Sequence, residues 1–122
     1  MIPKNVRIIG FESFSNCYNL IEVDMEDSHV NIIEDFAFHN CKRLESIKLS
    51  KTVRNIAKGA FNGCLNLREI DLPKKIKILP DFYNCHNLTK IIIRNETEVL
   101  NFTHLNSLDF KTKIFVPDIL LN

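Results

Sequence analysis

The segment that decides the fold reads Phe61-Asn62-Gly63-Cys64-Leu65-Asn66-Leu67-Arg68-Glu69-Ile70-Asp71-Leu72-Pro73. Its apolar residues form the skeleton F-x-x-C-x-x-L-x-x-I-x-L-P, which occurs in three further copies along the chain. Those copies are marked by Phe14 with Cys17, Phe38 with Cys41, and Phe82 with Cys85. The cysteines lie 24, 23 and 21 residues apart. A repeat of this length predicts a solenoid, because one short unit cannot bury its apolar face alone and stacked units can.

Each unit combines two local patterns. In Ile70-Asp71-Leu72 apolar and polar residues alternate, which predicts a strand with one buried face. In the preceding A-F-x-x-C-x-x-L segment the apolar residues are three and four apart, which predicts a helical or 3₁₀ turn. A second short extended segment is expected over residues 53–56 and their equivalents.

The chain of 122 residues is predicted to form one domain, residues 1–122. Its units are placed at about residues 3–25, 26–49, 50–72 and 73–93. A degraded terminal unit follows at 94–122, where the strand returns as Ile114-Phe115-Val116-Pro117. Terminal units of solenoids are usually atypical because they must cover the open end of the core.

The pattern V-x-x-I-x-x-x-A-F-x-x-C-x-x-L-x-x-I-x-L-P resembles the BspA-like leucine-rich repeat of bacterial surface proteins and of surface antigens in some protozoan parasites. The resemblance runs from Pro3 to about Ile93, with a degraded copy to Pro117. It implies a right-handed β/α coil with a parallel sheet on one face and short extended or 3₁₀ segments on the other. It also implies adhesion or protein binding, often to host or matrix proteins, without a fixed set of binding residues. The chain departs from relatives in having no polar N-terminal cap, signal or visible anchor.

Charge and hydropathy exclude several function classes. The formal net charge is +1, so no strong field points to nucleic acid. The longest apolar runs, such as Ile91-Ile92-Ile93, are far too short for membrane insertion. The start, Met1-Ile2-Pro3-Lys4, lacks the pattern of a signal peptide. Localisation stays open between the cytoplasm, if the chain is complete, and the cell surface or secretion, if it belongs to a longer protein.

No catalytic, cofactor-binding or metal-binding residues are predicted, and the chain is not expected to be an enzyme. The cysteines occur once per repeat, whereas zinc sites bring cysteines in close pairs. Neighbouring cysteines should lie about 5 Å apart, which also suits a disulfide. A buried column of reduced thiols is favoured, since free Cys behaves as a small apolar side chain. The histidines are expected on the surface: His29, His39, His86 and His104.

The outward face of the predicted sheet is the candidate protein-binding site. Its residues form one row of Glu22, Ser46, Glu69 and Lys90, and a second row of Asp24, Lys48, Asp71 and Ile92. In register, Asp24, Lys48 and Asp71 make an alternating charge ladder. The ladder is either a solvated face with cross-strand ion pairs or a polar recognition surface. Ile92 is the apolar exception, either a contact residue or a side chain covered by the terminal unit, and we favour the cover.

These patterns predict a non-enzymatic module for protein–protein interaction or adhesion, with its ligand at the sheet face. The alternatives are an intracellular scaffold and a structural spacer, as a fragment of a longer repeat array. The open ends of the solenoid, near Val6 and at Ile119-Leu120-Leu121, are expected to favour self-association.

Overall fold

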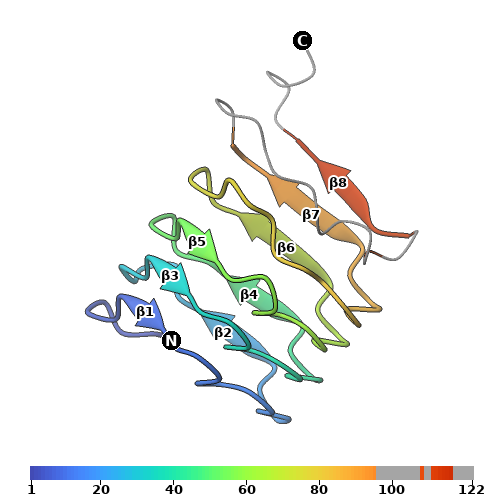
Figure 1. Ribbon diagram of the computed structural model, residues 1–122, viewed down its shortest axis with the longest axis horizontal. Helices are drawn as coiled ribbons and strands as arrows, with labels where there is room; N and C mark the ends of the chain where they lie inside the picture. Colours follow the sequence, from blue (N-terminus) through green and yellow to red (C-terminus); the bar gives the residue numbers. More distant parts are fainter. Residues whose placement is uncertain (96–107, 109–110, 117–122) are drawn as a thin grey trace.

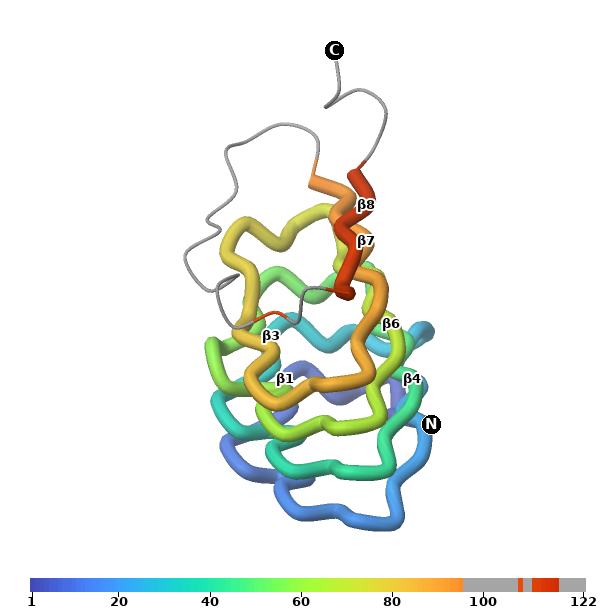
Figure 2. Tube along the Cα trace, turned by 90° about the vertical axis from the view of Figure 1, so that its right-hand side faces the viewer, coloured from blue at the N-terminus to red at the C-terminus, as the bar shows by residue number. Residues whose placement is uncertain are grey.

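The computed structural model describes residues 1–95, 108 and 111–116, and within them the chain forms short strands and no helix. The strands are β1 (Ile8–Ile9), β2 (Glu22–Asp24), β3 (Ile32–Ile33), β4 (Ser46–Lys48), β5 (Asn55–Ile56), β6 (Glu69–Leu72), β7 (Lys90–Ile93) and β8 (Lys113–Phe115). They lie in two rows, β1, β3 and β5 in one and the remaining strands in the other (Figure 1). Figure 2 shows the coils stacked one upon the next from the N-terminus onward.

Every strand pair is parallel and joins one coil to the next. In the first row β3 lies between β1 and β5, and in the second row β2 pairs with β4 and β7 lies between β6 and β8. No strand ladder joins β4 to β6 in the described part of the chain, although the two strands are neighbours (Figure 1). Just before them, the Arg68 N–H donates to the Glu45 carbonyl at 3.2 Å. The second row is therefore one face with a single interruption.

The expected strand alternation is confirmed. In β6, Ile70 and Leu72 are buried whereas Glu69 and Asp71 are exposed, and β4 repeats this pattern. The second extended segment expected over residues 53–56 is also present, as β5 and its equivalents β1 and β3. The apolar positions of both rows thus point into the space between them, where they form a common core.

The segment before each cysteine forms turns, and the helix implied by the apolar spacing is not found there in the described residues. The Cys64 N–H donates to the Phe61 carbonyl at 3.2 Å and closes a four-residue turn. The residue before the cysteine has a positive φ in each copy, 80° at Gly63. The equivalent values are 60°, 57° and 61° at Asn16, Asn40 and Asn84. A left-handed residue interrupts a right-handed helix, and Gly and Asn adopt that conformation most readily.

The turns direct main-chain groups toward the neighbouring coil. The Phe38 N–H donates to the Ala60 carbonyl and the Asn40 N–H donates to the Asn62 carbonyl, each at 2.9 Å. Equivalent bonds join the first coil to the second. Because buried main-chain groups must find partners, these bonds between coils replace the ones that a helix would make within itself.

Two columns of side chains run through the core. The rings of Phe14, Phe38, Phe61 and Phe82 are nearly parallel, with successive centroids 5.4, 5.7 and 6.4 Å apart. All four cysteines are free, and Cys41, Cys64 and Cys85 are buried as expected whereas Cys17 is half-buried. The thiols of Cys41, Cys64 and Cys85 each donate to the phenylalanine carbonyl of the preceding coil, at 3.0, 3.2 and 3.1 Å. Ring stacking and thiol donation therefore hold the same pairs of coils together.

The first coil is the open end of this core. Its Phe14 and Cys17 are half-buried, whereas the equivalent residues of the following coils are buried. Three large apolar side chains of this coil, Ile8, Phe11 and Tyr18, are more than half exposed. The other end at which self-association is expected, Ile119-Leu120-Leu121, lies outside the described residues.

Gly63→Ala is expected to lower the free energy of unfolding by about 1–3 kcal/mol. The new Cβ would be strained at a φ of 80° and would collide with the Asn40 side chain. Gly10→Ala is the matched control, since a Cβ there would meet its nearest atom, Glu34 Oε1, at 3.6 Å. Urea denaturation measures both variants. Equal losses would show that the left-handed residue before the cysteine is not required.

Candidate functional site

The sheet face consists of the outward side chains of β2, β4, β6 and β7, and all eight predicted site residues lie on it. Exposed members are Glu22, Ser46, Lys48, Glu69 and Asp71, and half-buried members are Asp24, Lys90 and Ile92. The register places Glu22 beside Ser46 and Asp24 beside Lys48, and it places Glu69 beside Lys90 and Asp71 beside Ile92. Each half of the face is thus arranged in the expected rows, and the interruption between β4 and β6 separates the halves.

Asp71 is held by an arginine that is not among the residues predicted from the sequence. Arg94 follows β7, and its Nε and Nη2 donate to the two Asp71 carboxylate oxygens at 2.5 and 2.9 Å. This two-point contact raises the pKa of Arg94, chiefly through the hydrogen bonds. The sequence contains a clue to this contact, because Arg94 continues the outward alternation of Lys90 and Ile92. With Leu72 paired to Ile93, Arg94 comes one residue beyond the partner strand's pair and lies near Asp71.

The expected charge ladder from Asp24 through Lys48 to Asp71 does not form as a chain of ion pairs. Lys48 makes no ion pair with any described residue, and Asp24 Oδ1 accepts the N–H of Glu26 at 3.0 Å. Asp71 is occupied by Arg94, whose planar guanidinium binds both carboxylate oxygens, a geometry that a lysine cannot offer. Lys48 is left as an unpaired charge on the face.

The terminal strand adds an aromatic residue to the sheet face. β8 pairs with β7, so Phe115 lies beside Ile92, and the Phe115 side chain is 46% exposed. The Lys90 Nζ lies over the Phe115 ring, 4.9 Å from its centroid. Part of the terminal unit therefore lies against Ile92, as favoured above, but it also presents a new apolar surface. The sequence pattern predicts a strand at this position, but Phe115 is not among the predicted site residues.

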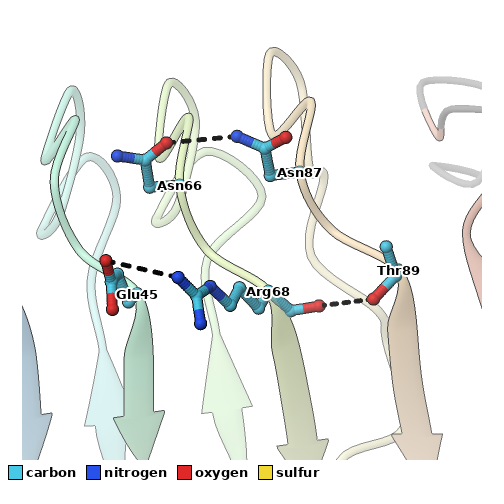
Figure 3. Close-up of a pocket in the computed structure, with 5 residues that line it drawn as sticks. All are labelled: Glu45, Asn66, Arg68, Asn87 and Thr89. Atoms are coloured by element: carbon cyan, nitrogen blue, oxygen red, sulfur yellow. Dashed lines mark hydrogen bonds and ion pairs between the residues drawn. The ribbon is translucent and has the colours of Figure 1, made fainter.

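One shallow hollow lies on the sheet face and another lies at its border. One, of about 720 Å³, lies over the interruption and is lined by side chains from both strands, including Lys48, Glu69 and Asp71. The other, of about 470 Å³, lies where the strands begin and is lined by Glu45, Asn66, Arg68, Asn87 and Thr89 (Figure 3).

The polar groups of the second hollow are largely paired with one another across coils. Asn87 Nδ2 donates to Asn66 Oδ1 at 3.1 Å, and Arg68 Nη2 lies 3.5 Å from Glu45 Oε1 (Figure 3). The Thr89 hydroxyl donates to the Arg68 carbonyl at 3.2 Å. These contacts tie successive coils together, so the hollow is a structural border of the sheet face and not a set of free ligand-binding groups.

Residues 1–111 match the family model described as BspA type Leucine rich repeat region, in 6 copies. The chain belongs to the BspA-type leucine-rich repeat family. The match includes the units that the sequence pattern marks less clearly, since only four copies carry the complete cysteine skeleton.

Two solved structures are similar to this BspA-type domain. A leucine rich cell surface protein from Faecalibacterium prausnitzii A2-165 is 28% identical over 94% of the chain, with a TM-score of 0.75. A leucine-rich repeat protein from Bacteroides ovatus ATCC 8483 shares the fold, at 22% identity over 77% of the chain and a TM-score of 0.52. The chain spans only 31% and 38% of those two chains. A comparison with curated proteins finds no match.

The cysteine column of this BspA-type domain is a packing feature. Burial raises the pKa of Cys41 to about 11 and that of Cys85 to about 12, and it also raises the pKa of Cys64. A thiol that stays protonated is a poor nucleophile and a poor metal ligand. The part of the chain that the structure describes has no group of three or more His, Cys, Asp or Glu side chains placed to hold a metal ion.

The histidines lie apart from one another along the chain. His29 and His86 are exposed as expected, His39 is half-buried against Phe36, and His104 lies outside the described residues. Over residues 1–95, 108 and 111–116, no helix has the length and apolar character needed to cross a membrane.

The raised thiol pKa values predict a loss of stability in alkaline solution. An unfolded thiol titrates near 9.0, so above that pH the unfolded chain releases protons that Cys64 and Cys85 retain when folded. Each of these thiols should lower the free energy of unfolding by roughly 1.4 kcal/mol per pH unit until its folded pKa is reached.

Urea denaturation at a series of pH values measures this slope. Cys85→Ala removes one of the titrating groups, so its free energy of unfolding should fall less steeply with pH, whatever stability the cavity costs at neutral pH. A slope identical to that of the unaltered protein would contradict the assignment.

Proposed function

We propose that this domain is a non-enzymatic protein-interaction or adhesion module that meets its ligand with the sheet face. The observation that carries the proposal is the unpaired charge there: Glu22, Lys48 and Glu69 are exposed and make no ion pair with any described residue. Isolated surface charges contribute little to folding stability, whereas a fixed pattern of them selects and orients a partner.

The end of the face that carries β7 and β8 supports the same proposal. Phe115 lies exposed beside Ile92, and Arg94 is held in place by Asp71. Aromatic and arginine side chains are enriched in protein interfaces, and a side chain that is already ordered loses less entropy on binding. The description of the F. prausnitzii structure as a cell surface protein favours adhesion over an intracellular role.

A second candidate function is that of a structural spacer or scaffold segment. The chain covers 31% of the F. prausnitzii chain, which supports a role as part of a longer repeat array. Phe14 and Cys17 of the open first coil are half-buried whereas their equivalents are buried, which favours end-on contacts between solenoids. In this role the sheet face would have no ligand.

A binding assay on immobilised extracellular-matrix proteins tests the first proposal. Lys48→Glu and Phe115→Ala are expected to weaken binding at least about tenfold, because one reverses an unpaired charge and the other removes the aromatic contact. Lys75→Glu is the matched control, a charge reversal at an exposed turn outside the sheet face. Equal binding by all three variants would reject the sheet face as the site. Failure of the unaltered domain to bind any matrix protein would reject adhesion in favour of the spacer role.

A further inference from the structure

Over β2, β4, β6 and β7 the charge on the sheet face changes sign from one coil to the next, and β8 adds a further lysine, Lys113, beside Lys90. The acidic coils present Glu22 and Asp24 from β2 and Glu69 and Asp71 from β6, and the basic coils present Lys48 from β4 and Lys90 and Arg94 from β7. Of these described residues, only Asp71 and Arg94 neutralise each other in a direct ion pair. Most of these alternating charges therefore have no oppositely charged partner within a single molecule.

We propose that the sheet face docks onto the same face of a second copy of this chain, with the order of the coils reversed. A pattern of minus, plus, minus, plus over four coils is complementary to itself on reversal. The two copies are related by a two-fold axis that runs along the strand direction between β4 and β6. This inference rests on the proposed use of the sheet face as a binding surface and names one partner for it.

Reversal brings specific residues opposite one another. The β2 coil faces the β7 coil of the second copy, so Glu22 lies opposite Lys90. The β4 coil faces the β6 coil, so Lys48 lies opposite Asp71. The two-fold axis repeats both contacts, so Glu22, Lys90 and Lys48 each gain an oppositely charged neighbour, and Asp71 is shared between Lys48 and Arg94 of its own copy. Face-to-face sheets pack about 10 Å apart, a gap that a Glu and a Lys side chain span together.

The same alternation excludes other arrangements of the two copies. A shift by one coil brings acidic coils opposite acidic coils, and lysines opposite lysines. If the order of the coils is kept instead, Glu22 meets Asp24 of the second copy and Glu69 meets Asp71. Both alternatives place like charges together, so the pattern selects one direction and one register.

The size of the patch sets the strength of the association. Four strands of three or four residues cover about 13 Å by 15 Å, which corresponds to about 200 Å² on each copy. Interfaces of this size are weak and transient. Because the contacts are exposed ion pairs, added salt should weaken them.

Sedimentation analysis of the purified chain, in low salt and over a concentration series that reaches the millimolar range, tests the proposal. The unaltered protein should form a reversible dimer, and Glu22→Lys and Lys90→Glu should each raise the dissociation constant about tenfold or more. An equimolar mixture of these two variants should regain the original affinity. In the mixed dimer the two substituted side chains meet each other with opposite charges, and the native Lys90 of one variant meets the native Glu22 of the other. Every pair is then attractive again, although positions 22 and 90 lie three coils apart in one molecule.

Lys75→Glu, which lies off the face, is the control and should leave the dissociation constant unchanged. A monomer at every concentration would overturn the self-docking, and so would a mixture no tighter than its two components. Association that persists in high salt and ignores both face variants would overturn it as well and would assign the contact to the open first coil. The sedimentation assay contains only this chain. If no dimer forms, self-docking is rejected, but the matrix-protein assay can still support the sheet face as a binding site.

Discussion

Each coil of this solenoid depends on a left-handed residue placed immediately before its cysteine. Gly63 and the equivalent asparagines are left-handed, as are Glu12 and Phe36 in the first two coils, and in these turns alternate N–H groups point out of their own coil toward the next one. A helix at the same position would satisfy its main-chain groups internally and would offer nothing to its neighbour. Stacking of the phenylalanines and donation by the thiols follow from this turn, because it sets the coils close enough for both contacts.

The sequence predicts the architecture well because the repeat itself carries the information. The alternation in Ile70-Asp71-Leu72 determines which side chains enter the core, and the cysteine spacing determines which residues lie above one another. The turn is found where the sequence predicts it, but its helical character is not confirmed, because its apolar residues recur at the spacing of a helix while the chain turns instead. The contrary signal is present, since Asn or Gly precedes every cysteine, and those residue types are typical of a left-handed position.

The sequence predicts which residues lie in each row of the sheet face, but it does not predict which side chains pair with one another. Outward positions follow from strand alternation, so the eight residues lie where expected. Which charges pair depends on the reach and shape of each side chain, and the planar Arg94 occupies Asp71 where a lysine is expected. Nothing in the sequence predicts that β4 and β6 lack a strand ladder. The repeat continues unchanged across these two coils, and β3 and β5 of the first row do pair there.

The thiol column provides a way to measure local opening between neighbouring coils. Each of the buried cysteines donates to a carbonyl of the preceding coil, so its sulfur stays buried while the two coils are in contact. Solenoids are joined only between neighbours, so local openings can occur at one junction while the others remain closed. Trapping by a thiol reagent would then record the opening frequency of each junction separately. Cys41, Cys64 and Cys85 serve as built-in reporters along the axis, one for each boundary among the first four coils.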